Sequence, residues 1–211
     1  MQIAVLLFDR FTALDAIGPY EVLGRLPGAR TVFVADQSGP ITTDVGTLAL
    51  TATASLAEVT RPDVLVVPGG PGQIARMTDA RLLDWLRTVD TSTTWTTSVC
   101  TGSLLLAAAG LLDGRRATSH WLALDQLPAF GAQPTGDRVV LDGKYVTAAG
   151  VSSGIDMALT LAGRIAGDAV AQTIQLGIEY DPQPPYTAGS PTTAPGSTVA
   201  ALRANPSLVL G

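Results

Sequence analysis

The chain has 211 residues, of which 46% are hydrophobic and 15% charged, so its composition is too apolar for a disordered protein. This length suits one domain, or one domain with a tail, and we expect such a domain to bury roughly 70% of its unfolded surface. The 13 basic and 18 acidic residues give a formal net charge of -5, which argues against a nucleic-acid partner because phosphate binding requires clustered Lys and Arg.

The sequence also indicates the cellular compartment of the protein. No uninterrupted apolar run approaches the ~20 residues that span a bilayer, so no membrane partner is expected. The first ten residues, MQIAVLLFDR, lack the basic start and the cleavage site of an export signal. A single cysteine cannot form an intramolecular disulfide, which suits a reducing environment. The sequence therefore predicts a cytoplasmic protein.

Short apolar or β-branched runs alternate with helical patterns along the chain. The predicted strands are residues 2–8, 31–35, 63–68 and 93–99. Helical spacing predicts helices over 15–26, around 82–89, over 102–112, from 152 onward, and over 168–179. Two stretches with alternating polarity, 41–53 and 137–150, predict hairpins. This order predicts an α/β sandwich with a mostly parallel sheet, helices on both faces and added antiparallel strands.

The end of the chain has a different composition. Residues 181–196 contain five of the 14 prolines and cannot form a regular helix. We therefore expect a single α/β domain over 1–180, followed by a Pro-rich segment, 181–211, that packs on the domain or on a partner subunit.

The only cysteine, Cys100, follows the predicted strand that ends at Val99 and immediately precedes a predicted helix. In an open α/β sheet, this position faces the crevice at the carboxyl ends of the strands. The sequence S-V-C-T-G-S is similar to a nucleophile elbow with cysteine in place of serine. Backbone N–H groups of Thr101 and Gly102 at the helix start would favour a thiolate and lower the cysteine pKa. The alternative is that Cys100 is a small buried hydrophobic residue.

A second turn at a strand end is the glycine-rich sequence GGPG, Gly69 to Gly72. Its backbone donors are unobstructed by side chains and would complete an oxyanion-type hole. An ordinary turn explains the same sequence equally well.

Two residues are candidates for proton transfer. His120, the only histidine, lies 20 residues after Cys100 and is either a dyad partner or a structural histidine. Asp15 lies between apolar residues just after the first predicted strand, where burial would raise its pKa into the range useful for an acid/base group. Asp15 could equally cap the following helix. One histidine and one cysteine offer too few ligands for a metal site, so no metal is expected.

Five motifs together resemble a known family: LDAIGPYEVL, VVPGGPG, TSVCTGSLLLAAAGLLDGRRATSHW, AAGVSSGIDMALTLA and IEYDPQPPYTAGSPTTAP. They are similar to the isocyanide hydratases, a branch of the PfpI-type, glutamine-amidotransferase-like superfamily. The first four occur across the superfamily, including the amidotransferase-like domains of AraC-type regulators. The combination of CTGS with EYDPQPPYTAGSP is closer to the hydratase branch.

The resemblance implies a flavodoxin-like sandwich, a homodimer, and hydration of an isocyanide R–NC to an N-substituted formamide without metal or organic cofactor. By position, Cys100 matches the nucleophile and Asp15 the acid/base carboxylate. Thr101 matches the residue after the nucleophile, Gly70 lies in the oxyanion-side turn, and Gly150 and Val151 fall in the loop that lines the pocket.

One departure from the wider superfamily matters for function. Peptidase or deglycase members carry His directly after the cysteine, and here that residue is Thr101, which counts against a Cys-His hydrolase. Two other functions remain open: a ligand-sensing dimer module like those of AraC-type regulators, and a Cys-dependent glyoxalase or deglycase. Only 15 residues follow Gly196, too few for the helix-turn-helix domain of such regulators, which favours an enzyme. Oxidation of Cys100 as a sensor is a further alternative.

Overall fold

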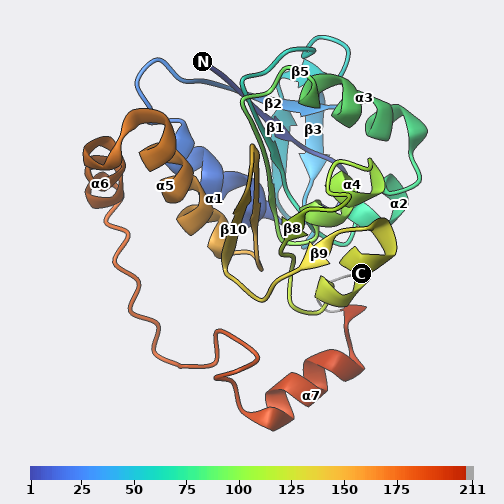
Figure 1. Cartoon of the computed structure of the whole chain (residues 1–211), viewed down its shortest axis with the longest axis vertical. Helices are drawn as coiled ribbons and strands as arrows, with labels where there is room; N and C mark the ends of the chain where they lie inside the picture. Colours follow the sequence, from blue (N-terminus) through green and yellow to red (C-terminus); the bar gives the residue numbers. More distant parts are fainter. Residues whose placement is uncertain (208–211) are drawn as a thin grey trace.

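The computed structural model describes residues 1–207 and contains a central seven-stranded sheet between two layers of helices (Figure 1). The strand order is β10-β11-β7-β6-β1-β2-β5, and all neighbours are parallel except β10 and β11. The strands of this sheet are β1 (Gln2–Leu6), β2 (Arg30–Ala35), β5 (Ala54–Ser55), β6 (Val64–Val67), β7 (Trp95–Val99), β10 (Val139–Asp142) and β11 (Tyr145–Ala148). The α/β sandwich predicted from the sequence is confirmed.

The helices cover both faces of the sheet (Figure 1). One face carries α1 (Ala13–Leu23), α5 (Ser153–Ala166) and, outside them, α6 (Asp168–Gly177). The other carries α2 (Gln73–Arg76), α3 (Ala80–Asp90) and α4 (Gly102–Ala108). The 3-10 helix Leu124–Phe130 follows α4 in the chain. Among the described residues, no helix is long and apolar enough to cross a membrane.

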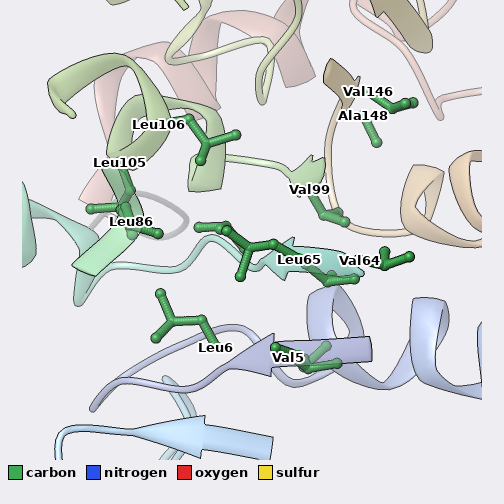
Figure 2. Packing of buried hydrophobic residues seen from close by; sticks show 14 of the residues in the cluster. Val5, Leu6, Val64, Leu65, Leu86, Val99, Leu105, Leu106, Val146 and Ala148 are labelled. Carbon is green, nitrogen blue, oxygen red and sulfur yellow. The ribbon is translucent and has the colours of Figure 1, made fainter. Parts of the chain in front are cut away.

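The core is continuous across the sheet because its central strands are apolar on both faces. All four residues of β6 are buried, as expected for a strand covered on two sides. Figure 2 shows side chains of β1, β6, β7 and β11 lying with Leu86 of α3 and Leu105 and Leu106 of α4. Asp79 caps α3, accepting a hydrogen bond from the Leu82 N–H at 3.2 Å.

Both predicted hairpins are present, but only the second one joins the main sheet. The first forms a separate two-stranded sheet, β3 (Gly39–Thr42) and β4 (Ala49–Ala52). The second, β10 and β11, joins the main sheet, because β11 pairs in parallel with β7 from Tyr145↔Thr96 to Ala148↔Val99. The sequence did not predict the short strands β5, β8 (Arg116–Ala117) and β9 (Gln133–Pro134) or helix α2.

The Pro-rich segment leaves the domain after α6 as an extended arm and ends in α7 (Gly196–Ala204), which has no buried residue (Figure 1). The arm returns to the domain at Trp121, over which the Arg203 guanidinium lies at 5.8 Å from the ring centre. Tyr186, in the middle of the arm, is 79% exposed. The last four residues of the predicted segment 181–211 lie outside the described residues.

Glycines set the distance between the elements that surround Cys100. Gly18 of α1 lies so close to α5 that an added Cβ would be 3.1 Å from Ile155 Cγ1. Gly154 of α5 faces the end of β7, where an added Cβ would be 3.1 Å from Val99 Cγ2. Small residues here let α1 and α5 pack tightly over the end of β7, which brings their first turns to the cysteine.

Candidate active site

Cys100 occupies a strained turn between β7 and α4, as the elbow-like sequence predicts. Its φ is 59°, a left-handed conformation that costs free energy for a residue with a side chain. Several hydrogen bonds hold this turn. The Cys100 N–H donates to the carbonyls of Ala148 (3.1 Å) and Ala149 (2.9 Å), and the Cys100 carbonyl accepts from the hydroxyls of Ser103 (3.2 Å) and Ser119 (3.1 Å). The side chain is thereby projected away from the sheet at a fixed position.

Backbone donors from two distant segments meet at the Cys100 sulfur. The N–H of Thr101, at the start of α4, and the N–H of Val151, just before α5, both interact with the thiol. Both interactions favour the anionic sulfur. The parallel pairing of β11 with β7 brings the loop around Val151 to the cysteine. We call this loop the pocket loop, because the resemblance implies that it lines the pocket.

Asp15 is fully buried on the first turn of α1 and interacts with the Cys100 thiol. Its Oδ2 accepts a hydrogen bond from the Gly69 N–H at 2.9 Å. Its Oδ1 has no hydrogen bond of standard geometry within the described residues, which leaves that oxygen free to exchange a proton. The helix-cap alternative for Asp15 is wrong, because the N-cap of α1 is Thr12.

Burial raises the pKa of Asp15 from 3.8 to about 7. The Gly69 N–H and the Cys100 thiol partly oppose this increase, and the negative charge of Asp44 adds to it. The direction is the one expected from the apolar sequence around Asp15. A carboxyl group with this pKa can both donate and accept a proton near neutral pH.

The pKa of Cys100 is raised well above its ordinary value, which differs from the sequence-based expectation. Burial of the thiol has the largest effect, and the negative charge of Asp15 raises the pKa further. The N–H groups of Thr101 and Val151 oppose the increase but do not outweigh it. Cys100 and Asp15 therefore share at least one proton at neutral pH, because two adjacent buried anions are unfavourable.

The glycine-rich turn supports the pair in a different way from the one expected. The Gly69 N–H donates to Asp15, and the Gly70 N–H donates to the Thr101 hydroxyl at 3.0 Å. Gly70 has a φ of 128°, which favours glycine. An added Cβ at Gly69 would lie 2.5 Å from the Thr101 nitrogen. The donors of this turn thus face the neighbouring protein groups, and the N–H groups directed at the sulfur come from Thr101 and Val151.

His120 behaves as a structural histidine in this arrangement. Burial lowers the pKa of His120 to about 4, so the ring is neutral at pH 7. Its Nδ1 accepts a hydrogen bond from the Leu122 N–H at 3.3 Å. The ring packs against Gly150 of the pocket loop, and His120 is not among the groups that act on the sulfur in the described part of the chain.

This packing gives a testable prediction for Gly150→Ala. The added Cβ would lie 2.7 Å from His120 Cδ2, so either the ring or the pocket loop must shift. We expect the free energy of unfolding to fall by about 1–3 kcal/mol and the reaction of Cys100 with iodoacetamide to change in rate, because Val151 follows directly. Chemical denaturation and alkylation kinetics measure the two effects. Gly136→Ala is the matched control, since an added Cβ there meets nothing within 4 Å; equal effects from both variants would contradict the prediction.

The buried carboxyl of Asp15 also makes a prediction about stability and pH. Between its unfolded pKa near 3.8 and its folded pKa of about 7, the folded state binds more protons than the unfolded state, so stability falls as pH rises. At pH 8 we expect Asp15→Asn to be more stable than the unmodified protein by up to about 4 kcal/mol, and at pH 4 this advantage should disappear. Urea denaturation at both pH values measures it. An advantage that is the same at both pH values would contradict the raised pKa.

The pair is nearly closed to solvent. Cys100 is 2% exposed and Asp15 is inaccessible. A cavity of about 860 Å³ lies at the carboxyl ends of β1 and β2, but its lining residues include neither Cys100 nor Asp15. Within residues 1–207, no three His, Cys, Asp or Glu side chains form a cluster suited to a metal ion.

Two groups around the pair were not identified from the sequence: Ser119 and Asp44. Gly69 was identified as part of the glycine-rich turn, but its N–H holds the Asp15 carboxyl group. Ser119 follows the two-residue strand β8, which pairs with β9 outside the main sheet and has no signal in the sequence, so its contact with the Cys100 carbonyl could not be predicted. Asp44 lies in the β3–β4 loop, and nothing in the sequence relates that loop to α1.

Comparisons with known proteins identify the family of this chain and agree with its fold. The model of the DJ-1/PfpI family matches residues 1–164. An isonitrile hydratase from Pseudomonas putida is 47% identical over 212 residues, covering 100% of this chain and 92% of that protein. The HTH-type transcriptional regulator CdhR from Pseudomonas aeruginosa is 32% identical over 162 residues, covering 75% of this chain but only 48% of the regulator. A crystal structure of a ThiJ/PfpI family protein from Pseudomonas syringae superposes with a TM-score of 0.95 at 40% identity, covering 99% of this chain and 87% of that one.

Proposed function

The chain belongs to the DJ-1/PfpI family, and on that premise we propose that it hydrates isocyanides to N-substituted formamides, with Cys100 as nucleophile and Asp15 as acid and base. The observation that carries this proposal is the buried pair itself, a thiol and a carboxyl group in contact, with a neutral histidine set apart from them. The full-length similarity to an isonitrile hydratase supports the substrate class, isonitrile being another word for isocyanide.

The chemistry of an isocyanide suits a site with one nucleophile and one proton donor at the same place. Its terminal carbon receives both the nucleophile and the proton, so the two groups must reach one atom. The Cys100 sulfur and the free Oδ1 of Asp15 meet this requirement. The reacting end of R–N≡C is linear and narrow, which suits a thiol that is only 2% exposed.

The proposed reaction has two stages that balance without a further reagent. In the first, the Cys100 sulfur bonds to the isocyanide carbon while the thiol proton passes through Asp15 to the same carbon, which gives the thioimidate R–N=CH–S–Cys100. In the second, Asp15 takes a proton from water, and the hydroxide adds to that carbon. Asp15 returns this proton to the nitrogen, the carbon–sulfur bond breaks as the carbonyl forms, and the hydroxyl proton of the adduct passes through Asp15 to the sulfur, so R–NH–CHO leaves with the Cys100 thiol restored.

The backbone groups around the sulfur have a supporting part in this mechanism. The N–H groups of Thr101 and Val151 stabilise negative charge on sulfur when Asp15 holds the proton. Gly70 fixes the Thr101 hydroxyl, and Gly150 lets His120 pack under the pocket loop. No metal or organic cofactor has a part in this scheme.

We further propose that the protein works as a homodimer, with 1–180 as the domain and the arm from residue 181 lying on the partner subunit. The arm supports this because α7 has no buried residue and Tyr186 is 79% exposed within one chain. The single cysteine must stay a free thiol for this chemistry, which favours the cytoplasm as its compartment.

The test is conversion of an aromatic isocyanide by the purified protein, with formamide formation followed by absorbance and mass spectrometry. In water enriched in ¹⁸O, the formamide should carry one heavy oxygen, because water supplies that atom. A protein with its thiol intact by titration and no turnover would contradict the proposal. Activity on glyoxals, or binding of a small molecule without turnover, would then identify a deglycase or a ligand-sensing module.

A further inference from the structure

A chain of hydrogen bonds connects the loop between β3 and β4 to the Cys100–Asp15 pair. The Thr12 hydroxyl donates to Asp44 Oδ2 at 2.6 Å, and the other Asp44 oxygen accepts from the Val45 N–H at 2.8 Å. Asp44 is partly buried beside the start of α1, although 29 residues separate it in sequence from Asp15. Neither the family motifs nor the proposed mechanism gives Asp44 a role.

The Thr12 hydroxyl has an unusual hydrogen-bond partner for a residue at a helix start. It is the N-cap of α1, where a threonine hydroxyl ordinarily accepts a hydrogen bond from its own helix, but it makes no such cap. Its hydroxyl donates to Asp44 instead. Its backbone is bonded on both sides: the Thr12 N–H donates to the Gly69 carbonyl at 2.9 Å, and the Thr12 carbonyl accepts from the Asp15 N–H at 3.1 Å. Since the Gly69 N–H holds the Asp15 carboxylate, Thr12, Asp15 and Gly69 form a closed ring of hydrogen bonds.

The position of Asp44 is fixed independently of its carboxylate. The Asp44 N–H donates to the Phe11 carbonyl at 2.9 Å, and Phe11 forms a parallel bridge with Thr43. The Arg10 N–H donates to the Thr42 carbonyl at 2.8 Å, and Arg10 has a strained φ of 61°. These backbone bonds remain when the Asp44 side chain is changed, so substitutions there test the carboxylate alone.

We propose that Asp44 is a positioning residue for the Cys100–Asp15 pair, which holds the start of α1 through the Thr12 hydroxyl and places a second negative charge beside the pair. The hydrogen bond sets where the Asp15 carboxyl sits relative to the sulfur. The charge makes Asp15 retain its proton to a higher pH. The turnover part of this inference rests on the proposed function.

Few ionisable groups act on Asp15, so the contribution of Asp44 to the pKa of Asp15 can be measured separately. The ionisable groups that act on Asp15 are Cys100, from the elbow, and Asp44, from the β3–β4 loop, and the glycine turn adds only the uncharged Gly69 N–H. On α5, which packs against α1, Asp156 is bonded to Arg138 at 2.6 Å. The charged residues of the β1–α1 connection are exposed: Asp9 and Arg10.

Three single variants and one double variant separate the hydrogen bond from the charge. Asp44→Asn keeps an oxygen for the Thr12 hydroxyl and removes the charge, so the rise of kcat/KM with pH should move to lower pH, with maximal kcat changed by less than about threefold. Asp44→Ala and Thr12→Val each remove the bond and should lower kcat by about tenfold with KM nearly unchanged. The double variant should lose no more than either single variant, because both changes remove the same bond.

The rate of Cys100 alkylation by iodoacetamide as a function of pH provides a readout that needs no isocyanide. Its rise near the Asp15 pKa should move to lower pH in Asp44→Asn. If the unmodified protein hydrates no isocyanide but this shift occurs, the proposed function is wrong and the role of Asp44 stands. Matched controls are Thr42→Val, an exposed threonine of the same hairpin, and Asp137→Asn, an exposed aspartate, which should match the unmodified protein in both assays.

Two results would overturn the proposal. One is an Asp44→Asn alkylation profile that coincides with that of the unmodified protein. The other is strict additivity of Asp44→Ala and Thr12→Val in kcat, or in alkylation rate if no turnover exists. Circular dichroism and thermal melting of every variant confirm folding. If Asp44→Ala unfolds, the isosteric Asp44→Asn decides the matter, because it keeps one acceptor oxygen for the Thr12 hydroxyl and the backbone bonds of the loop and gives up only the bond to the exposed Val45 N–H.

Discussion

Replacing Cys100 with alanine should abolish formamide formation, lowering kcat by at least about 10⁴-fold. The reason is that the sulfur forms the only covalent bond to the substrate in the proposed reaction, and the Asp15 carboxyl, without it, has no nucleophile to activate. The measurement is turnover of an aromatic isocyanide by absorbance, with product identified by mass spectrometry. The fold should persist, since alanine fits the space of a small buried side chain that is held by backbone bonds.

Cys100→Ser is the stricter version of this experiment. The hydroxyl has nearly the same shape but a far higher pKa, so a carboxyl group with a pKa of about 7 is too weak a base to activate it. We expect activity as low as for the alanine variant. Substantial turnover by the alanine variant would mean that water attacks the isocyanide directly and that the thioimidate has no part in the reaction, whereas turnover by the serine variant alone would mean that an oxygen nucleophile can replace the sulfur.

Asp15→Asn should lower kcat by about 10²–10⁴-fold, because an amide can neither give nor take the proton that both stages require. The amide oxygen can still accept from the Gly69 N–H, so the first turn of α1 should keep its position. The remaining activity should lose the rise with pH near 7 that titration of Asp15 gives the unmodified protein. Steady-state kinetics from pH 5 to pH 9 measure both the fall in kcat and the loss of the rise in activity near pH 7.

The matched control for Asp15→Asn is Asp9→Asn. Asp9 lies in the same connection between β1 and α1 but is exposed, and its amide should leave both the rate and the pH profile unchanged. If the activity of Asp15→Asn still rose with pH near 7, another group would have to provide the proton. His120 could not provide it, since burial lowers its pKa to about 4.

The main elements of the fold could be predicted from the sequence because each carries a strong local signal. β6 is a run of four apolar residues covered on both faces, and α3 has its buried residues at helical spacing behind a capping aspartate. The two-residue strands β5, β8 and β9 carry no such signal, since they form where neighbouring backbone happens to offer a pairing edge. The pairing of β11 with β7 is a long-range contact, which a hairpin pattern cannot predict.

Some features of the candidate site could likewise be predicted from the sequence, and others could not. Cys100 and Asp15 could be found because strand ends in a parallel sheet meet at one edge. The direction of the cysteine pKa could not be predicted from the helix start alone, because burial and the Asp15 charge depend on how tightly α1 and α5 close over the sulfur. The Gly70 N–H was likewise expected to be free, whereas it donates to the Thr101 hydroxyl, a contact between turns 31 residues apart in the chain.

The groups around the Cys100–Asp15 pair come from residues 69, 101 and 151, so the site is spread across most of the domain. During synthesis on a ribosome, the cysteine emerges about 50 residues before Val151, and domains generally fold as units. Until the pocket loop and α5 have been made, the nascent chain carries an ordinary thiol with no buried carboxyl group beside it. The reactive pair is therefore created by the completion of the domain, and an unfinished chain has none of its chemistry.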